Sequence, residues 1–376
     1  MADSRKLEEM GGYVGLDNHN HKNRRFVTSS SAASDDDIIS NLSDDLINPI
    51  LVRLPIEEAV RTSVLSKKWS IPKEIHLDSF QEVDQWMFIL SRKSVKELAI
   101  INFNRIYPVP SSVFSCLELR VLQLHNCAFK PPLEFQGFPN LQHFGLQHFS
   151  LGDNLGQAMF NVPQLKKLVL IGCGDVNNFN INAMLLRPLE DFLQVERFNL
   201  AMMSRNLPNI VYFTIDGYFL KFLSAEKFPK RLPHAIKCLR WLEVHNFSFS
   251  ELDQVQGALC MLRNSPNLET LRVTHMQTGP NADLELTTNY LESPDCLDQT
   301  LFMLQTVEMT SLEGSRPELL FIKLLLDHSP HLENMIIRPS ATVDAEKRHN
   351  IAKYVMLFPR ASSKAKMVYL DPLTGT

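Results

Sequence analysis

A triplet of apolar residues at positions i, i+3 and i+5 recurs along most of the chain. Three apolar slots match by chance at roughly one position in twelve, so the recurrence is informative and a single triplet is not. The last two slots are two residues apart and share one face of a strand, so each triplet predicts a short strand with that face buried. The triplets are Val95-Leu98-Ile100, Leu119-Leu122-Leu124, Leu141-Phe144-Leu146, Leu165-Leu168-Leu170, Ile210-Phe213-Ile215, Leu239-Leu242-Val244, Leu268-Leu271-Val273, Leu304-Val307-Met309 and Leu332-Met335-Ile337.

The spacing of these triplets predicts a repeat architecture. With a degenerate member at Leu189 included, successive triplets start 24, 22, 24, 24, 21, 29, 29, 36 and 28 residues apart. All but one of these spacings fall in the range of leucine-rich repeats, which stack one strand per repeat into a horseshoe with a parallel sheet. The sequence therefore predicts an α/β solenoid.

Two further marks accompany the triplets. Proline stands two residues before the first slot in five repeats, where it is expected to turn the chain into the strand because its φ is fixed and it lacks a donor. These residues are Pro139, Pro163, Pro208, Pro266 and Pro330. Cys127 and Cys173 lie three residues after the last slot, a position at which such repeats place Asn or Cys, and we expect both to be structural.

A different, helical pattern precedes the repeats. Ser43 is placed to cap a helix whose first turn holds Asp44 and Asp45, and this helix is expected to reach about residue 53. Apolar residues then recur at spacings of three and four, and Pro49 predicts a kink within the pattern. The apolar positions are Leu46, Ile47, Ile50, Leu51 and Leu54, continued after Pro55 by Val60, Val64, Leu65 and Trp69 in a second helical stretch.

Composition narrows the function classes. The 376 residues carry a formal net charge of -4, which argues against an electrostatic grip on nucleic acid by the whole protein. The longest uncharged stretch, residues 135–152, is broken by polar side chains, so no transmembrane helix is predicted. Residues 1–34 are polar, carry no apolar signal core and are expected to be a disordered tail. A cytoplasmic or nuclear location is the expectation.

The sequence carries no recognisable catalytic motif. No Gly-rich phosphate loop, no Gly-x-Ser-x-Gly elbow and no His-Glu-x-x-His helix is present. The six cysteines form no Cys-x-x-Cys pair and are expected to be free, buried thiols. We therefore expect a non-catalytic protein without a cofactor or bound metal.

Residues 38–46, 50–55 and 58–69 together resemble a plant F-box. In that family a small three-helix unit docks on a Skp-type adaptor and so recruits a cullin-RING ubiquitin ligase. The resemblance implies an adaptor-binding surface made or supported by Leu42, Ile50, Leu51, Leu54, Pro55, Val64 and Trp69. The family usually has proline where Ser43 stands, rarely has one at Pro49, and carries a longer connector after Trp69.

The C-terminal part is similar to the FBD region that follows leucine-rich repeats in plant F-box proteins. It contains the apolar helical stretch 318–326, the segment 354–362 and a strand-like run at 365–369. The expected organisation is a tail at 1–34, an F-box at 35–72, leucine-rich repeats at 73–296 and an FBD region at 297–376 that caps the array.

The resemblance implies a substrate receptor of a Skp-cullin-F-box ubiquitin ligase, whose repeat and FBD surface binds an unknown target protein. Pro49 and the short connector motivate the alternative of a repeat scaffold or ligand receptor that no longer engages a ligase. No nucleic acid or membrane partner is expected. Positions beside the triplet slots are geometric candidates for target contact: Gln123, His125, Gln147, Glu243 and His245.

Overall fold

The structure is a computed structural model that describes residues 68–70, 80–92, 94–102, 105–132, 134–151, 162–172, 200, 204–205, 207–223, 231–276 and 284–372. The predicted tail, the degenerate repeat at Leu189, Cys173 and most of the predicted F-box lie outside these residues.

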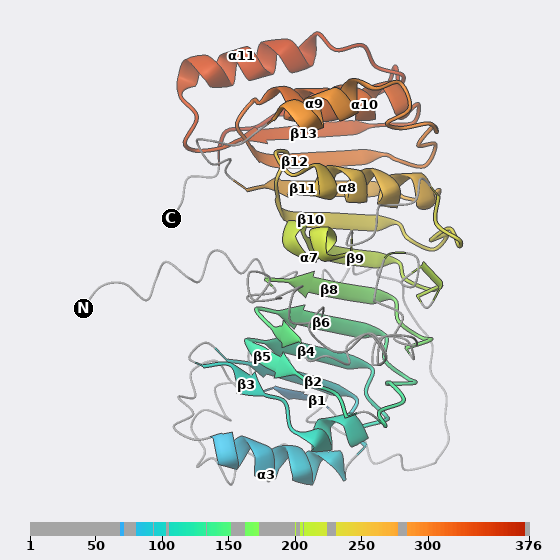
Figure 1. Ribbon diagram of the computed structural model, residues 1–376, viewed down its shortest axis with the longest axis vertical. Helices are drawn as coiled ribbons and strands as arrows, with labels where there is room; N and C mark the ends of the chain where they lie inside the picture. Colours follow the sequence, from blue (N-terminus) through green and yellow to red (C-terminus); the bar gives the residue numbers. More distant parts are fainter. Residues whose placement is uncertain are drawn as a thin grey trace, which may run out of the picture.

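An eleven-stranded parallel sheet runs the length of the described chain, with its strands stacked one above the other (Figure 1). Strands follow one another in sequence order, as expected for one strand per repeat. The strands are β1 (Lys68–Ser70), β2 (Glu97–Ile101), β4 (Val121–His125), β6 (His143–Gln147), β8 (Lys167–Ile171), β9 (Tyr212–Asp216), β10 (Trp241–Phe247), β11 (Thr270–His275), β12 (Thr306–Leu312), β13 (Asn334–Pro339) and β14 (Lys366–Tyr369).

Smaller elements connect these strands. A second parallel sheet contains β3 (Tyr107–Pro108), β5 (Cys127–Phe129) and β7 (Ser150–Leu151). The helices are α3 (Phe80–Ser91), the 3₁₀ turn η1 (Ser111–Ser115), α7 (Gly217–Phe222), α8 (Leu252–Asn264), α9 (Glu285–Glu292), α10 (Arg316–His328) and α11 (Ala345–Met356). Figure 1 shows α3 at one end of the stack and α11 at the other. Among the described helices, none has the length and apolarity of a membrane span.

The triplets form the core, as predicted. Every residue of the nine triplets is at most 4% exposed. The second slot of each repeat pairs in register with that of the next, as in Leu98 with Leu122 and Leu122 with Phe144. The third slots pair in the same way, so two continuous rows of apolar side chains are buried along the array and no repeat buries its own row alone.

The prolines act as turn residues. Phe138 accepts a hydrogen bond from the amide of Leu141, which places Pro139 at the second position of a four-residue turn. Proline favours that position because its φ is already set. The same bond spans Pro163, Pro208, Pro266 and Pro330. An asparagine that was not predicted to matter follows three of these prolines, and its side-chain amide donates to a carbonyl of the preceding repeat. These residues are Asn140, Asn209 and Asn267.

The chain leaves several strands through a left-handed residue. Positive φ occurs directly after a strand at Asn126 (54°), His148 (47°) and Gly172 (67°), and at the register shift near the end of β10 and of β12 at Asn246 (49°) and Ser311 (62°). Glycine and small polar side chains tolerate this conformation best. Cys127 follows the first of these turns and is fully buried, with its thiol donating to the carbonyl of His125 at 3.3 Å, which confirms its predicted structural role.

Three expectations need revision or extension. Trp69 was placed on a helix, but its backbone lies in β1, in register with Leu98 of β2. Parallel pairing with β2 provides hydrogen-bond partners for the backbone of residues 68–70. This pairing outweighs the preference for a helix that the apolar spacing indicates. Cys238 is exposed, not buried, because it sits in the turn before β10.

The sheet continues without a break across residue 296, since β12, β13 and β14 pair onto β11 in order.

Candidate interaction face

The face of the sheet opposite the buried triplets is the candidate functional surface. Along β2, β4, β6 and β8 fully buried residues alternate with half-buried or exposed ones. A β-strand sends successive side chains to opposite faces, so the less buried positions form one surface, which we call the open face. All five positions expected beside the triplet slots lie on it.

An aromatic pair stands in the middle of the open face. Tyr212 of β9 is 47% exposed and pairs in register with Trp241 of β10. Their ring centroids are 6.4 Å apart with the planes inclined at 44°. Aromatic side chains offer large contact area at low entropic cost and are enriched where proteins bind proteins.

A charged pair extends this aromatic pair along the sheet. The guanidinium carbon of Arg272, on β11, lies 4.5 Å from the ring centroid of Trp241, within cation–π distance. Its Nε lies 2.9 Å from Oε2 of Glu308 on β12. Arg272 is therefore held between an indole ring and a carboxylate before any partner arrives.

Glu243 completes the group. Burial alone raises the pKa of this carboxyl, but hydrogen bonds from His245 and Trp241 and the charges of His245 and Arg272 together lower it below its usual value. His245 Nε2 lies 3.3 Å from its Oε1. Glu243 is therefore ionised at neutral pH. We call Tyr212, Trp241, Glu243, Arg272 and Glu308 the central cluster.

The remaining expected positions lie toward the N-terminal repeats. Gln123 and Gln147 are exposed. His125 is half-buried, lies 3.1 Å through Nδ1 from the carbonyl of Asn102, and packs edge-on against the ring of His148 at 5.0 Å. Gln123, His125 and Gln147 lie on the same open face as the central cluster but in other repeats, away from its aromatic and charged pairs.

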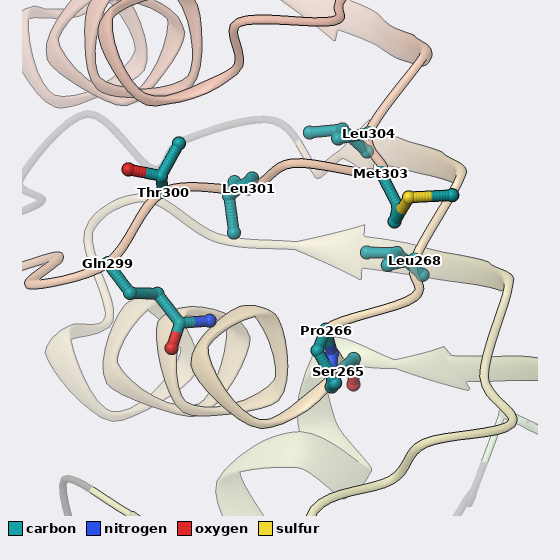
Figure 2. Close-up of a pocket in the computed structure, with 8 residues that line it drawn as sticks. All are labelled: Ser265, Pro266, Leu268, Gln299, Thr300, Leu301, Met303 and Leu304. Carbon is teal, nitrogen blue, oxygen red and sulfur yellow. The ribbon is translucent and has the colours of Figure 1, made fainter.

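A small hollow lies near the C-terminal end of α8 (Figure 2). This hollow, between α8 and the loop before β12, has a cavity volume of only about 10 Å³, roughly the room of one water molecule. It is lined by Ser265, Pro266, Leu268, Gln299, Thr300, Leu301, Met303 and Leu304. Small-molecule sites are far larger than this hollow, whereas an ordered Arg–Trp–Tyr group on an open sheet face suits contact with another macromolecule.

Three buried cysteines are poorly placed to act as nucleophiles. Burial raises the pKa of the thiols of Cys116 and Cys260 to about 11 and that of Cys127 to about 12, so these cysteines remain protonated at neutral pH. Among the residues that the structure describes, no group of His, Cys, Asp or Glu is arranged to hold a metal ion.

Four residues of the central cluster were not predicted from the sequence: Tyr212, Trp241, Arg272 and Glu308. Each lies directly beside a buried slot, as Trp241 does before Leu242, so alternation alone could have placed them on the open face. The grouping depends on strand register, which brings Tyr212 and Trp241 together from different repeats.

Of the predicted adaptor-binding residues, Leu42, Ile50, Leu51, Leu54, Pro55 and Val64 lie outside the described part of the chain. Trp69 is described only through its backbone in β1. The grouping of these seven residues on one surface stays a prediction.

Comparison with known proteins identifies both regions. A family model described as the At1g61320/AtMIF1 LRR domain matches residues 60–355, and the F-box domain model matches residues 39–71. F-box/FBD/LRR-repeat protein At1g13570 of Arabidopsis thaliana is 26% identical, and the alignment covers 89% of this chain and 99% of that protein. F-box/FBD/LRR-repeat protein At5g56420 of the same plant is 23% identical over equal shares.

Among solved structures, an internalin of Listeria monocytogenes is 11% identical, with a TM-score of 0.34 over 88% of this chain and 90% of the internalin. That likeness is too distant to inform the site. The repeat model spans most of the chain, and the F-box model ends at residue 71, just after β1, the first strand of the sheet. The chain therefore belongs to the plant F-box/FBD/LRR-repeat proteins, with a leucine-rich-repeat domain of the At1g61320/AtMIF1 family.

Proposed function

We propose that this chain is the non-catalytic substrate-recognition subunit of a Skp-cullin-F-box ubiquitin ligase. The observation that carries the proposal is the F-box match at residues 39–71, which extends into the first strand of an array with a partly exposed sheet face. F-box domains generally bind Skp-type adaptors. In this proposal the F-box docks on the adaptor, while the open face and the C-terminal region bind the target protein in the cytoplasm or nucleus.

The proposed adaptor surface consists of Leu42, Ile50, Leu51, Leu54, Pro55, Val64 and Trp69. Support comes from the helical spacing of the apolar residues before β1: a short helical unit cannot bury all of them internally, so some require a partner. The central cluster supports the target-binding half, because Trp, Tyr and Arg dominate the energetically important positions of protein interfaces.

Co-expression of the full chain with a plant Skp-type adaptor tests the first half. We expect a stable complex that Leu51→Asp and Leu54→Asp each abolish, because a buried unpaired carboxylate is costly at an apolar interface. Leu286→Asp is the matched control, since Leu286 is 62% exposed on α9. Retention of the adaptor by both F-box variants would refute this surface.

A repeat scaffold with a degenerate F-box is the second candidate, favoured by Pro49 inside the predicted helix. In that case the wild-type chain fails to retain the adaptor while Pro49→His restores binding. Equal adaptor binding by both forms excludes it.

A further inference from the structure

The C-terminal end of α11 exposes large apolar side chains. Tyr354 is 58% exposed, Met356 43% and Leu357 73%, whereas Ile351 and Val355 on the inner side of the helix are almost fully buried. Figure 1 shows α11 at the far end of the stack. Terminal elements of repeat arrays usually present a polar outer face to water. Lys347, His349 and Asn350 do so along α11, but its C-terminal end also exposes these three large apolar side chains.

Cationic side chains border these apolar ones. Residues three and four apart on a helix are neighbours, so Lys353 and Tyr354 both lie next to Leu357. Arg360 follows the helix and its guanidinium donates to the carbonyls of Met356 at 3.3 Å and Ala365 at 3.1 Å, which orders it. We call Lys353, Tyr354, Met356, Leu357 and Arg360 the α11 end patch.

The positive charge of this end is not neutralised within the described chain. Neither Lys353 nor Arg360 forms an ion pair with a described residue. Residues 347–370 contain no Asp or Glu, in a protein whose formal net charge is -4. Their cations are Lys347, Arg348, Lys353, Arg360, Lys364 and Lys366. The acidic residues of the helix, Asp344 and Glu346, stand at its opposite end.

We propose that the α11 end patch binds an acidic protein segment that also carries large apolar side chains. Its carboxylates would pair with Lys353 and Arg360, for which Arg offers a fork of parallel donors. Its apolar side chain would cover Tyr354 and Leu357, removing their surface from water. Charge complementarity selects this class of partner.

Other partner classes fit the patch less well. Nucleic-acid interfaces are far more positively charged and do not centre on a group of exposed apolar side chains. A helix that lies on a membrane presents its apolar face to lipid, but the apolar face of α11 packs on the solenoid through Ile351 and Val355.

Fluorescence anisotropy with the full chain tests the proposal without any adaptor. The probe is a fluorescein-labelled peptide of repeated Glu-Glu-Leu units. We expect saturable binding that Lys353→Glu and Leu357→Ser each weaken by about tenfold or more. The matched control variants are Lys130→Glu, at an exposed lysine after β5, and Leu286→Ser on α9. Circular dichroism melting confirms that each variant is folded.

Competition separates the partner classes. A peptide with Lys in place of Glu and one with Ser in place of Leu should compete poorly. No binding of the acidic peptide, equal binding by the patch variants and wild type, or stronger competition by duplex DNA or anionic phosphatidylserine vesicles would overturn the proposal. Because this readout lacks the adaptor, its failure is distinguishable from failure of the ligase function.

Discussion

The buried imidazole of His275, on β11, lies with Nε2 3.2 Å from Oε1 of Glu318, on α10. Nδ1 of the same ring lies 2.8 Å from the carbonyl of Phe247. A carbonyl only accepts, so Nδ1 carries a proton and Nε2 faces the carboxyl. Glu318 also accepts backbone bonds at the start of α10, from Glu313, Gly314 and Ser315. This pair ties a central strand to the helix of a later repeat.

Removing the imidazole should therefore destabilise the array. His275→Ala leaves the buried carboxyl of Glu318 without the imidazole nitrogen beside it, and a buried polar group that loses its partner costs about 1 to 3 kcal/mol. Urea unfolding monitored by circular dichroism measures the change, with His234→Ala at an exposed loop position as control. Equal stability of the two variants would show that the pair contributes nothing.

Glu318 also predicts a pH dependence. Burial raises the pKa of its carboxyl, against the lowering effects of His275 and the three backbone donors. A group with a raised folded pKa binds its proton more tightly when folded, so its contribution to stability is present at acid pH and lost as pH rises through that pKa. Glu318→Gln removes the titration. The unfolding free energy of wild type minus that of Glu318→Gln should fall as pH rises from about 4; an increase contradicts the assignment.

The repeat core predicts a large cost for shortening a triplet residue. Leu168 is fully buried between Phe144 and Phe213 of the neighbouring strands. Leu168→Ala should destabilise the protein by about 2 to 5 kcal/mol through lost burial and an unfilled cavity. Leu286→Ala, at an exposed position, should change stability by less than about 0.5 kcal/mol. Thermal melting of both variants checks the contrast.

The central cluster predicts a loss of binding without a loss of stability. Arg272→Glu reverses the charge between Trp241 and Glu308, and Arg272 lies on the exposed face of the sheet with 44% of its side chain exposed, so the fold should be retained. Affinity purification from plant cells with degradation blocked should recover fewer target proteins with this variant. Arg316→Glu is the matched control, because Arg316 is an exposed, ion-paired arginine on α10. If the Arg272→Glu variant recovers as many target proteins as the wild type, the open face does not bind the target.

The sequence predicted the repeat core because its signal is local. The triplet slots, the turn prolines and Cys127 each depend on residues a few positions apart, and all three predictions are confirmed. The final strand, β14, was also predicted, although its residues do not match the triplet.

The failures depend on contacts between distant residues. Trp69 fits a helical period, but the strand that follows α3 offers it a pairing partner at Leu98. The central cluster requires the register of β9 to β12, and the His275–Glu318 pair joins residues from different repeats. A pattern of nearby residues carries no information on contacts between different repeats. The sequence therefore placed candidate residues on one face of the sheet but did not show which of them contact one another.

The mass of the purified complex tests the central claim most directly. The full chain, of 43.0 kDa, co-expressed with a Skp-type adaptor, is separated by size exclusion and weighed by light scattering. We predict a species with the summed mass of one chain and one adaptor, which gains the mass of a cullin when that subunit is added. Elution of the chain at its own mass, with the adaptor in a separate peak, would contradict the account.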